Sequence, residues 1–171
     1  VEGNGGDITV NAGSVNLRDG AQLISSTSGK GNAGNITLTA KNKILLSGDS
    51  RINSDAKFSA IGNGADINIQ AQNIYLTNDA EVDTNSFGQG NSGNIQIKTD
   101  DSLFIFSGAR LSSIIVGQGK AGNIDLEVGN LAYLDGFGKD GGSSGIYSVV
   151  GPSLPTQEFP IERTGGNVAI N

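Results

Sequence analysis

Apolar and polar residues alternate along most of this chain of 171 residues, in short runs that recur at a near-constant spacing. Because an alternation of period two places successive side chains on opposite faces of a strand, these runs predict β-strands and not helices. Each repeating unit holds two alternating runs and a third run marked by one aliphatic residue. The first runs carry Ile8 and Val10, Ile36 and Leu38, Ile67 and Ile69, Ile95 and Ile97, and Ile124 and Leu126; the second carry Val15 and Leu17, Ile44 and Leu46, Ile74 and Leu76, Leu103 and Ile105, and Ala132 and Leu134; the third are marked by Leu23, Ile52, Val82 and Leu111.

A short signature of a small residue, an Asx residue and an aliphatic residue opens every unit. Its Asx positions, separated by 28, 31, 28, 29 and 44 residues, are Asp7, Asn35, Asp66, Asn94, Asn123 and Asn167. Three strands per unit, repeated in this way, predict an all-β fold, a right-handed parallel β-helix (solenoid) of about six three-strand coils. The longer last gap predicts a loop insertion near the C-terminus, residues 135–164, between coils 5 and 6.

Equivalent positions of successive units should form columns, because a coil of a solenoid pairs and buries its residues only against the coils above and below. The six Asx residues are expected to form a structural ladder at one corner, where Asx tolerates a left-handed backbone. Small hydroxyls just beyond the third strand should close one end of the core, at Ser25, Ser54, Thr84 and Ser113. On the outward side, Gln22, Arg51, Glu81 and Arg110 should stack with alternating charge.

Composition narrows the class of protein further. The chain has 27 glycines, 3 prolines and 36% hydrophobic residues, which favours an elongated fold with a thin core. It has no cysteine and no histidine, which removes disulfides, thiolate metal sites and the usual catalytic triads. The net charge of -6 argues against nucleic acid or an anionic membrane as partner, and no apolar run is long enough for direct membrane insertion. A start in mid-repeat without Met leads us to expect one β-helix segment, residues 1–171, of a longer protein.

Two patterns in the sequence resemble ligand-binding motifs, and their position in the repeat indicates whether they bind a ligand. The pattern Gly-x-Gly-x-x-Gly occurs at residues 29–34, 88–93 and 117–122, each time at the same phase and before a strand. A dinucleotide loop instead opens a helix, so we interpret these copies as coil-closing loops. Calcium-binding β-rolls repeat a glycine- and aspartate-rich nonapeptide, of which residues 3–7 are one partial echo. We predict no metal site and no cofactor, although Asp135 with Asp140 could hold an ion if their loops converge.

Catalysis would depend on carboxylates, and two pairs on outward strand positions qualify. These are Asp125 with Glu127 and Glu81 with Asp83. Carboxylates, cations and aromatics are scattered along the sequence, so we predict that the chain is not an enzyme and has no catalytic residues. Sugar binding would use exposed aromatic rings. Four aromatic residues in or beside the insertion are candidates for binding, with packing against the solenoid as the other interpretation: Tyr133, Phe137, Tyr147 and Phe159.

The segments GNAGNITLTA at residues 31–40 and LRDGAQL at residues 17–23 resemble the repeats of filamentous-haemagglutinin-type exoproteins, the cyanobacterial members in particular. The resemblance covers residues 1–134 and resumes at Gly165. It implies a bacterial protein, Gram-negative in type, that is exported by two-partner secretion through an outer-membrane partner and stays secreted or at the cell surface. It also implies a structural and adhesive role, as a rigid stalk that presents binding loops to a surface polysaccharide or a cell-surface receptor. The alternative is a β-helical protein that binds or degrades polysaccharide.

Overall fold

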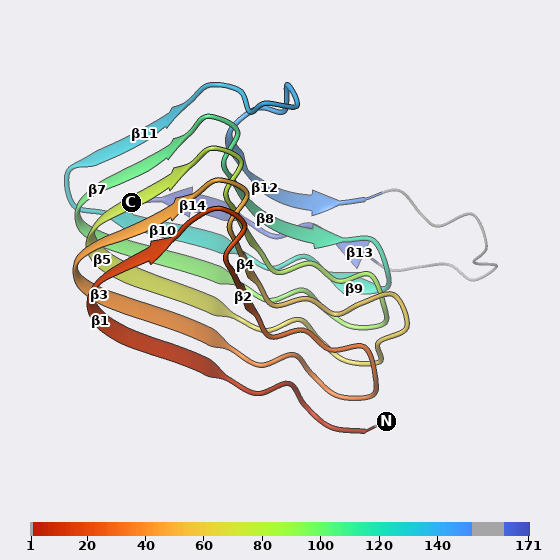
Figure 1. Cartoon of the computed structure of the whole chain (residues 1–171). Helices are drawn as coiled ribbons and strands as arrows, with labels where there is room; N and C mark the ends of the chain where they lie inside the picture. The colour runs from red at the N-terminus through yellow and green to blue at the C-terminus, as the bar shows by residue number, and fades with distance from the viewer. Residues whose placement is uncertain (1, 152–162) are drawn as a thin grey trace.

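The computed structural model describes residues 2–151 and 163–171, and the described residues form an all-β parallel solenoid without a helix (Figure 1). The predicted fold class is therefore confirmed. The first strand of the repeat stacks in six layers, but the complete turns number about four, slightly fewer than the six coils expected.

Two sheets form most of the coil wall. The larger sheet contains β1 (Ile8–Leu17), β3 (Ile36–Ser47), β5 (Ile67–Thr77), β7 (Ile95–Phe106), β10 (Ile124–Val128), β11 (Leu131–Asp135) and β14 (Val168–Ile170). The second contains β2 (Gln22–Ile24), β4 (Arg51–Asn53), β6 (Glu81–Asp83), β8 (Arg110–Ile115) and β12 (Gly145–Val150). A short pair, β9 (Gly119–Lys120) with β13 (Arg163–Thr164), lies on a third side.

The first and second predicted strands are one bent strand in most coils. In the pairing of β1 with β3, the register shifts between Ala12 and Ser14, and the next two pairings shift at the equivalent place. A register shift of this kind lets a strand bend without leaving the sheet. The expected three-strand coil is thus built from a long bent strand and a short one, and only the last coil keeps β10 and β11 apart.

Aliphatic side chains from the two main sheets meet inside the coil. Ile36, Ile67, Ile95 and Ile124 pair in one column, and each is 0% exposed. The third-strand column that faces them, which includes Ile52 and is continued by Ile146 in the last coil, closes the same core. The alternation read from the sequence therefore has the predicted phase.

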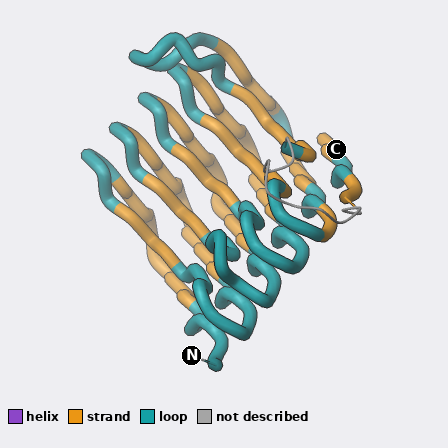
Figure 2. Tube along the Cα trace, turned by 90° about the vertical axis from the view of Figure 1, so that its right-hand side faces the viewer, coloured by secondary structure: helices purple, strands orange, loops and turns teal. Residues whose placement is uncertain are grey.

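The third side of the coil is formed by isolated parallel bridges and loops, which lie one above another in Figure 2. The three Gly-x-Gly-x-x-Gly segments lie here and lead into β3, β7 and β10, so they close coils as predicted. Their last glycine is required by the close approach of neighbouring coils. A Cβ on Gly93 would lie 2.1 Å from the carbonyl oxygen of Ala65 in the preceding coil.

The last coil corrects the predicted insertion. β12 lies within residues 135–164, yet it pairs in parallel with β8 over six residues, so this part continues the stack. Arg110 follows Phe106 by four positions, whereas its partner Gly145 follows Asp135 by ten, which places six extra residues before β12. The other extra residues follow β12, in a stretch that includes residues 152–162, outside the described part of the chain.

Candidate functional site

The predicted Asx ladder is present at the corner that precedes the long strand. The backbone N–H of each member donates to the side-chain Oδ1 of the equivalent residue one coil earlier. The donor-to-acceptor distances are 2.7, 3.1, 2.7, 2.9 and 2.9 Å, in chain order from the pair Asn35–Asp7 to the pair Asn167–Asn123. The predicted ladder is therefore present at each coil boundary, but none of its six residues has the left-handed backbone that was expected; Asp19, Asp49, Asn78 and Asp79 have it instead.

Two further ladders were not predicted. In one, Asn4, Asn32, Asn63 and Asn91 each accept the backbone N–H of the next coil at 2.8–2.9 Å. These residues stand three positions before the corner Asx in their units, a spacing that the sequence does display. In the other, Asp55 accepts the N–H of Asn85, and Asn85 accepts that of Ile114. Its members differ in residue type, so the sequence repeat hides it.

The hydroxyl column closes the core as predicted. Ser54, Thr84 and Ser113 are 0% exposed, and their hydroxyls bond the backbone of the glycine corner, as Thr84 Oγ1 does to Gly93 O at 2.6 Å. Ser148 in β12 is a fifth member that sequence reasoning missed. It donates to Gly122 O and accepts from Gly166 N, each at 3.0 Å. It was missed because β12 was assigned to the insertion.

The four candidate aromatic residues do not form one site. Tyr133, on β11, lies against Phe104, which stacks on Tyr75 with ring centroids 4.9 Å apart. Phe137 is 72% exposed in the turn after β11, and Tyr147 lies on β12 in the other main sheet. Phe159 lies outside the described residues.

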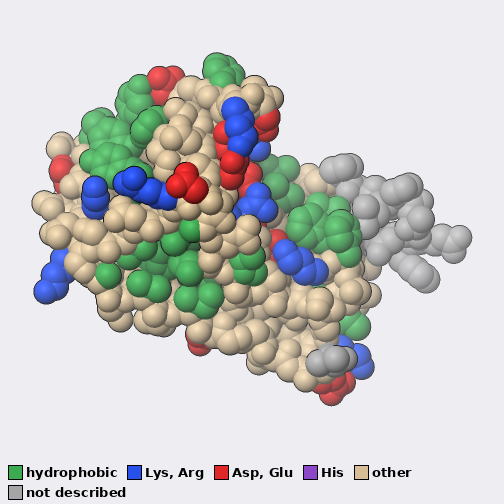
Figure 3. All heavy atoms as spheres, viewed as in Figure 1, with side chains coloured by type: hydrophobic (Ala, Val, Ile, Leu, Met, Phe, Trp, Pro, Cys, Tyr) green, Lys and Arg blue, Asp and Glu red, His purple; other side chains and the backbone are tan. Residues whose placement is uncertain are grey.

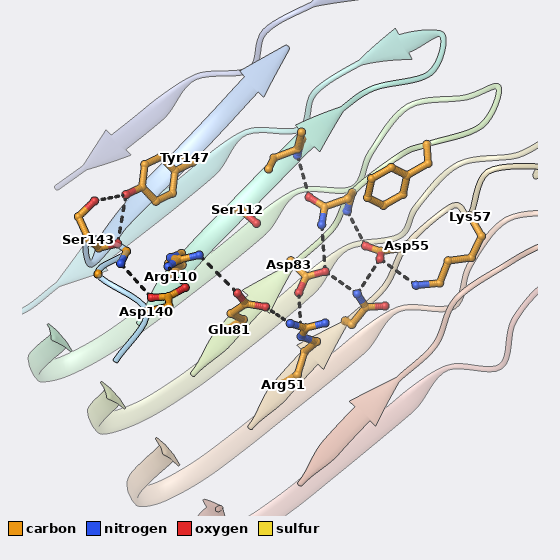
Figure 4. Close-up of a pocket in the computed structure, with 16 residues that line it drawn as sticks. Arg51, Asp55, Lys57, Glu81, Asp83, Arg110, Ser112, Asp140, Ser143 and Tyr147 are labelled. Atoms are coloured by element: carbon orange, nitrogen blue, oxygen red, sulfur yellow. Dashed lines mark hydrogen bonds and ion pairs between the residues drawn. The ribbon is translucent and has the colours of Figure 1, made fainter. Parts of the chain in front are cut away.

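Tyr147 instead belongs to a groove on the outer face of β4, β6, β8 and β12. The groove has a volume of about 890 Å³ and is open along one side. Parallel pairing places Asn53, Asp83, Ser112 and Tyr147 in one column across these strands. Figure 4 shows Tyr147 with Ser143 at one end of the groove and Lys57 with Asp55 at the other.

Charged side chains line the groove in alternation. Glu81 lies between Arg51 and Arg110, as the sequence predicts, and is hydrogen-bonded to the Arg51 guanidinium. Arg110 Nη1 lies 3.8 Å from Glu81 Oε1, and Arg110 Nη2 lies 3.6 Å from Asp140 Oδ2. Both separations are those of ion pairs and exceed the usual hydrogen-bond length, so charge holds the Arg110 guanidinium in the groove.

The floor of the groove is a buried carboxyl pair. Asp55 and Asp83 are 3% and 4% exposed, and the amide of Asn53 donates to both. Burial, together with the neighbouring Asp55 carboxylate, raises the pKa of Asp83 to about 8. Each carboxyl group also has a cation beside it: Lys57 Nζ lies 3.0 Å from Asp55 Oδ2, and Arg51 Nε lies 3.8 Å from Asp83 Oδ2.

The six-residue expansion before β12 forms one wall of the groove. Asp140 accepts the N–H of Gly142 at 2.8 Å, and Lys139 reaches back to Asp49, three coils earlier. The backbone N–H of Gly142 and the charge of Arg110 lower the pKa of Asp140. Figure 3 shows positive and negative side chains side by side above the turns between the two main sheets.

The remaining candidates lie elsewhere. Asp125 and Glu127 are outward residues of β10, in the other sheet, and Glu127 binds Lys98 at 2.6 Å. Asp135 accepts from the Tyr133 hydroxyl, while Asp140 faces Arg110. Within residues 2–151 and 163–171, no three acidic side chains converge as metal ligands, and no helix could cross a membrane.

Fold and surface together define a parallel β-solenoid with side-chain ladders at its corners and a charged groove on one face. Comparisons with protein-family models, with curated proteins and with solved structures find no match to this chain.

Proposed function

We propose that this chain is a structural and adhesive segment of a secreted or cell-surface protein, a rigid stalk that presents a binding surface. The corner Asx ladder supports this most directly, because it joins every coil to the next from Asp7 to Asn167. Bending the rod at any level would break ladder bonds and strand pairs together, so the solenoid transmits position over its length without a flexible joint.

The resemblance of the repeats to filamentous-haemagglutinin-type exoproteins supports the location. Within this proposal the parent protein is exported by two-partner secretion, through an outer-membrane partner, to the surface of a Gram-negative-type bacterium. A fold stabilised by hydrogen-bond ladders, with no cysteine, tolerates either redox environment. Its partner is a surface polysaccharide or a cell-surface receptor.

Adhesion of coated beads tests this proposal. Beads that carry the folded chain should adhere to cells or to polysaccharide-coated surfaces, and beads that carry the heat-denatured chain should not. Circular dichroism of the protein before coupling establishes that the chain is folded. Folded-chain beads that adhere to no cell and no polysaccharide would overturn the adhesive part of the proposal.

Polysaccharide degradation is a second candidate, favoured by one observation. The pKa of Asp83 is raised, as it is in a general acid, and Asp83 lies two positions from Glu81 on the same strand face, as an acid and a base would in a glycosidase. The Asp83 carboxyl, however, is buried under hydrogen bonds from Asn53 and Asn85. This burial favours a structural role for the Asp83 carboxyl over proton transfer to a substrate. Release of reducing ends from polysaccharides, abolished by Glu81→Gln, would establish the enzyme instead.

A further inference from the structure

We propose that the groove on the outer face of β4, β6, β8 and β12 binds a neutral oligosaccharide, which stacks on the ring of Tyr147 and bonds through its hydroxyls to Glu81, Arg110 and Ser112. This deepens the adhesive role proposed above, since it names the binding surface and the class of ligand.

The groove has the size and shape of a small-ligand site. Its volume of about 890 Å³ falls within the range of ligand pockets, about 300–1,000 Å³. Four parallel strands, spaced about 4.8 Å apart, extend it across about 14 Å of the face. The buried side chains of Asn53, Asp55 and Asp83 fix its floor through hydrogen bonds to one another, so the cavity is formed before any ligand enters.

Hydrogen-bonding groups remain free at the centre of the groove. Ser112 lies there, and its hydroxyl bonds to no described residue (Figure 4). Beside it, the Arg110 guanidinium forms ion pairs at 3.6–3.8 Å, and Glu81 Oε1 accepts no hydrogen bond from a described residue. An acceptor, a set of donors and a hydroxyl in one place suit the adjacent hydroxyl groups of a sugar ring.

Tyr147 supplies the apolar surface that a sugar ring requires. A Cβ on Gly145 would lie 2.7 Å from Tyr147 Cζ, so the phenol ring lies down on the strand over this glycine. The hydroxyl is bonded to Ser143 at 3.0 Å, which fixes the ring against the loop. The ring is thus held against the protein on the side of Gly145, and Tyr147 lines the groove.

The exposed aromatic column on the other sheet is a weaker platform. Tyr75 and Phe104 stack with an angle of 1° between their planes, so they cover each other's faces. Tyr133 continues the same column. Tyr133 is therefore a matched control for Tyr147, with the same side chain outside the groove.

The ion pairs within the groove disfavour an anionic ligand. The three cations of the groove, Arg51, Lys57 and Arg110, each lie within 4 Å of a carboxylate. An anionic sugar would have to separate these pairs, and it would meet a chain with a net charge of -6.

Calorimetric titration of the full chain tests the proposal, with hexasaccharides of neutral glucan, mannan and xylan as probes and a hexagalacturonate as the anionic comparator. At least one neutral probe should bind, and the anionic one should bind more weakly. Tyr147→Ala should weaken binding about tenfold, whereas Tyr147→Phe and Tyr133→Ala should leave it within about twofold. Ser112→Ala should weaken it about threefold to tenfold, and the exposed Ser14→Ala should not.

Circular dichroism and thermal melts of each variant separate loss of binding from loss of folding. Failure of every neutral probe to bind the folded chain would overturn the proposal, as would tighter binding of the anionic probe or equal effects of Tyr147→Ala and Tyr133→Ala. If no oligosaccharide binds the folded chain but beads that carry Tyr147→Ala still adhere, the adhesive stalk is supported and only the proposed binding site in the groove is rejected. If an oligosaccharide binds the chain but coated beads do not adhere, the groove is supported as a binding site and the adhesive role is rejected.

Discussion

The middle coils and the last coil follow the same repeat but put it to different uses. In the coils built from β3 to β8, the inward aliphatic residues are fully buried, and each corner residue has a partner above and below. In the last coil, which contains β10 to β13, the chain before β12 is six residues longer, and Val168, in the layer that follows it, is 45% exposed. The regular coils supply stability, and the irregular coil supplies the wall of the groove.

Truncation of an inward aliphatic residue should give the largest difference in stability between the two regions. Ile95→Ala should lower the free energy of unfolding by about 2–5 kcal/mol, because the cavity is enclosed by coils on both sides. Val168→Ala, at the end of the same column, should cost far less. Urea titrations measure both, with the outward-facing Gln96→Ala as control. A larger loss from Gln96→Ala than from Ile95→Ala would show that the strand phase is wrong.

The glycine corner should give the next largest difference. Gly93→Ala places a methyl group against the Ala65 carbonyl of the coil below and should cost about 1–3 kcal/mol. Gly165→Ala, after β13, meets no atom of a described residue within 4 Å and should be tolerated. Thermal melts of the two variants test this, and equal melting temperatures would refute the role of close coil approach.

The pH dependence of stability should arise in the middle coils. Because the folded pKa of Asp83, about 8, lies above the usual aspartate value, its contribution is fully present below pH 4 and is lost as the pH rises to about 8. We expect stability to fall over this window by at least about 1 kcal/mol. Asp83→Asn should flatten that part of the profile.

Asp140, in the last coil, should have the opposite dependence. Its folded pKa is lowered, so its contribution is present above the unfolded pKa and is lost as the pH falls through the folded pKa. Because this carboxylate is exposed, Asp140→Asn should change the profile little and only in acid. An unchanged slope between pH 4 and about pH 8 in Asp83→Asn would disprove the assignment to Asp83.

The Asx ladder should give the smallest difference. Asn94→Ala removes the acceptor for Asn123 N–H and should cost about 0.5–1.5 kcal/mol. The Asn167 side chain accepts no ladder bond within the described residues, so Asn167→Ala should be close to neutral. Chemical denaturation measures the free energy of unfolding of both variants. An equal loss at the two positions would show that the ladder bond accepted by Asn94 does not contribute to stability.

Much of the fold could be predicted because a solenoid converts sequence repetition directly into contacts. A residue such as Asn94 has its partners about one repeat away in either direction, so residue type and spacing together predict the neighbour. The core phase, the Asx ladder, the hydroxyl column and the position of Glu81 between two arginines all followed from this rule. The bent long strand did not, because the break between the two alternating runs is equally consistent with a turn between two separate strands.

The groove could not be predicted, for the complementary reason. It brings together residues that the repeat does not relate, such as Asp55 on the floor, Asp140 in the expanded turn and Tyr147 on a strand that the sequence assigned to an insertion. The sequence by itself determined which residues stack, because stacking is a local rule applied at a fixed interval. Only the tertiary structure decided where the extra residues fold back over the stack, because that depends on long-range pairs such as Lys139 with Asp49, which have no period.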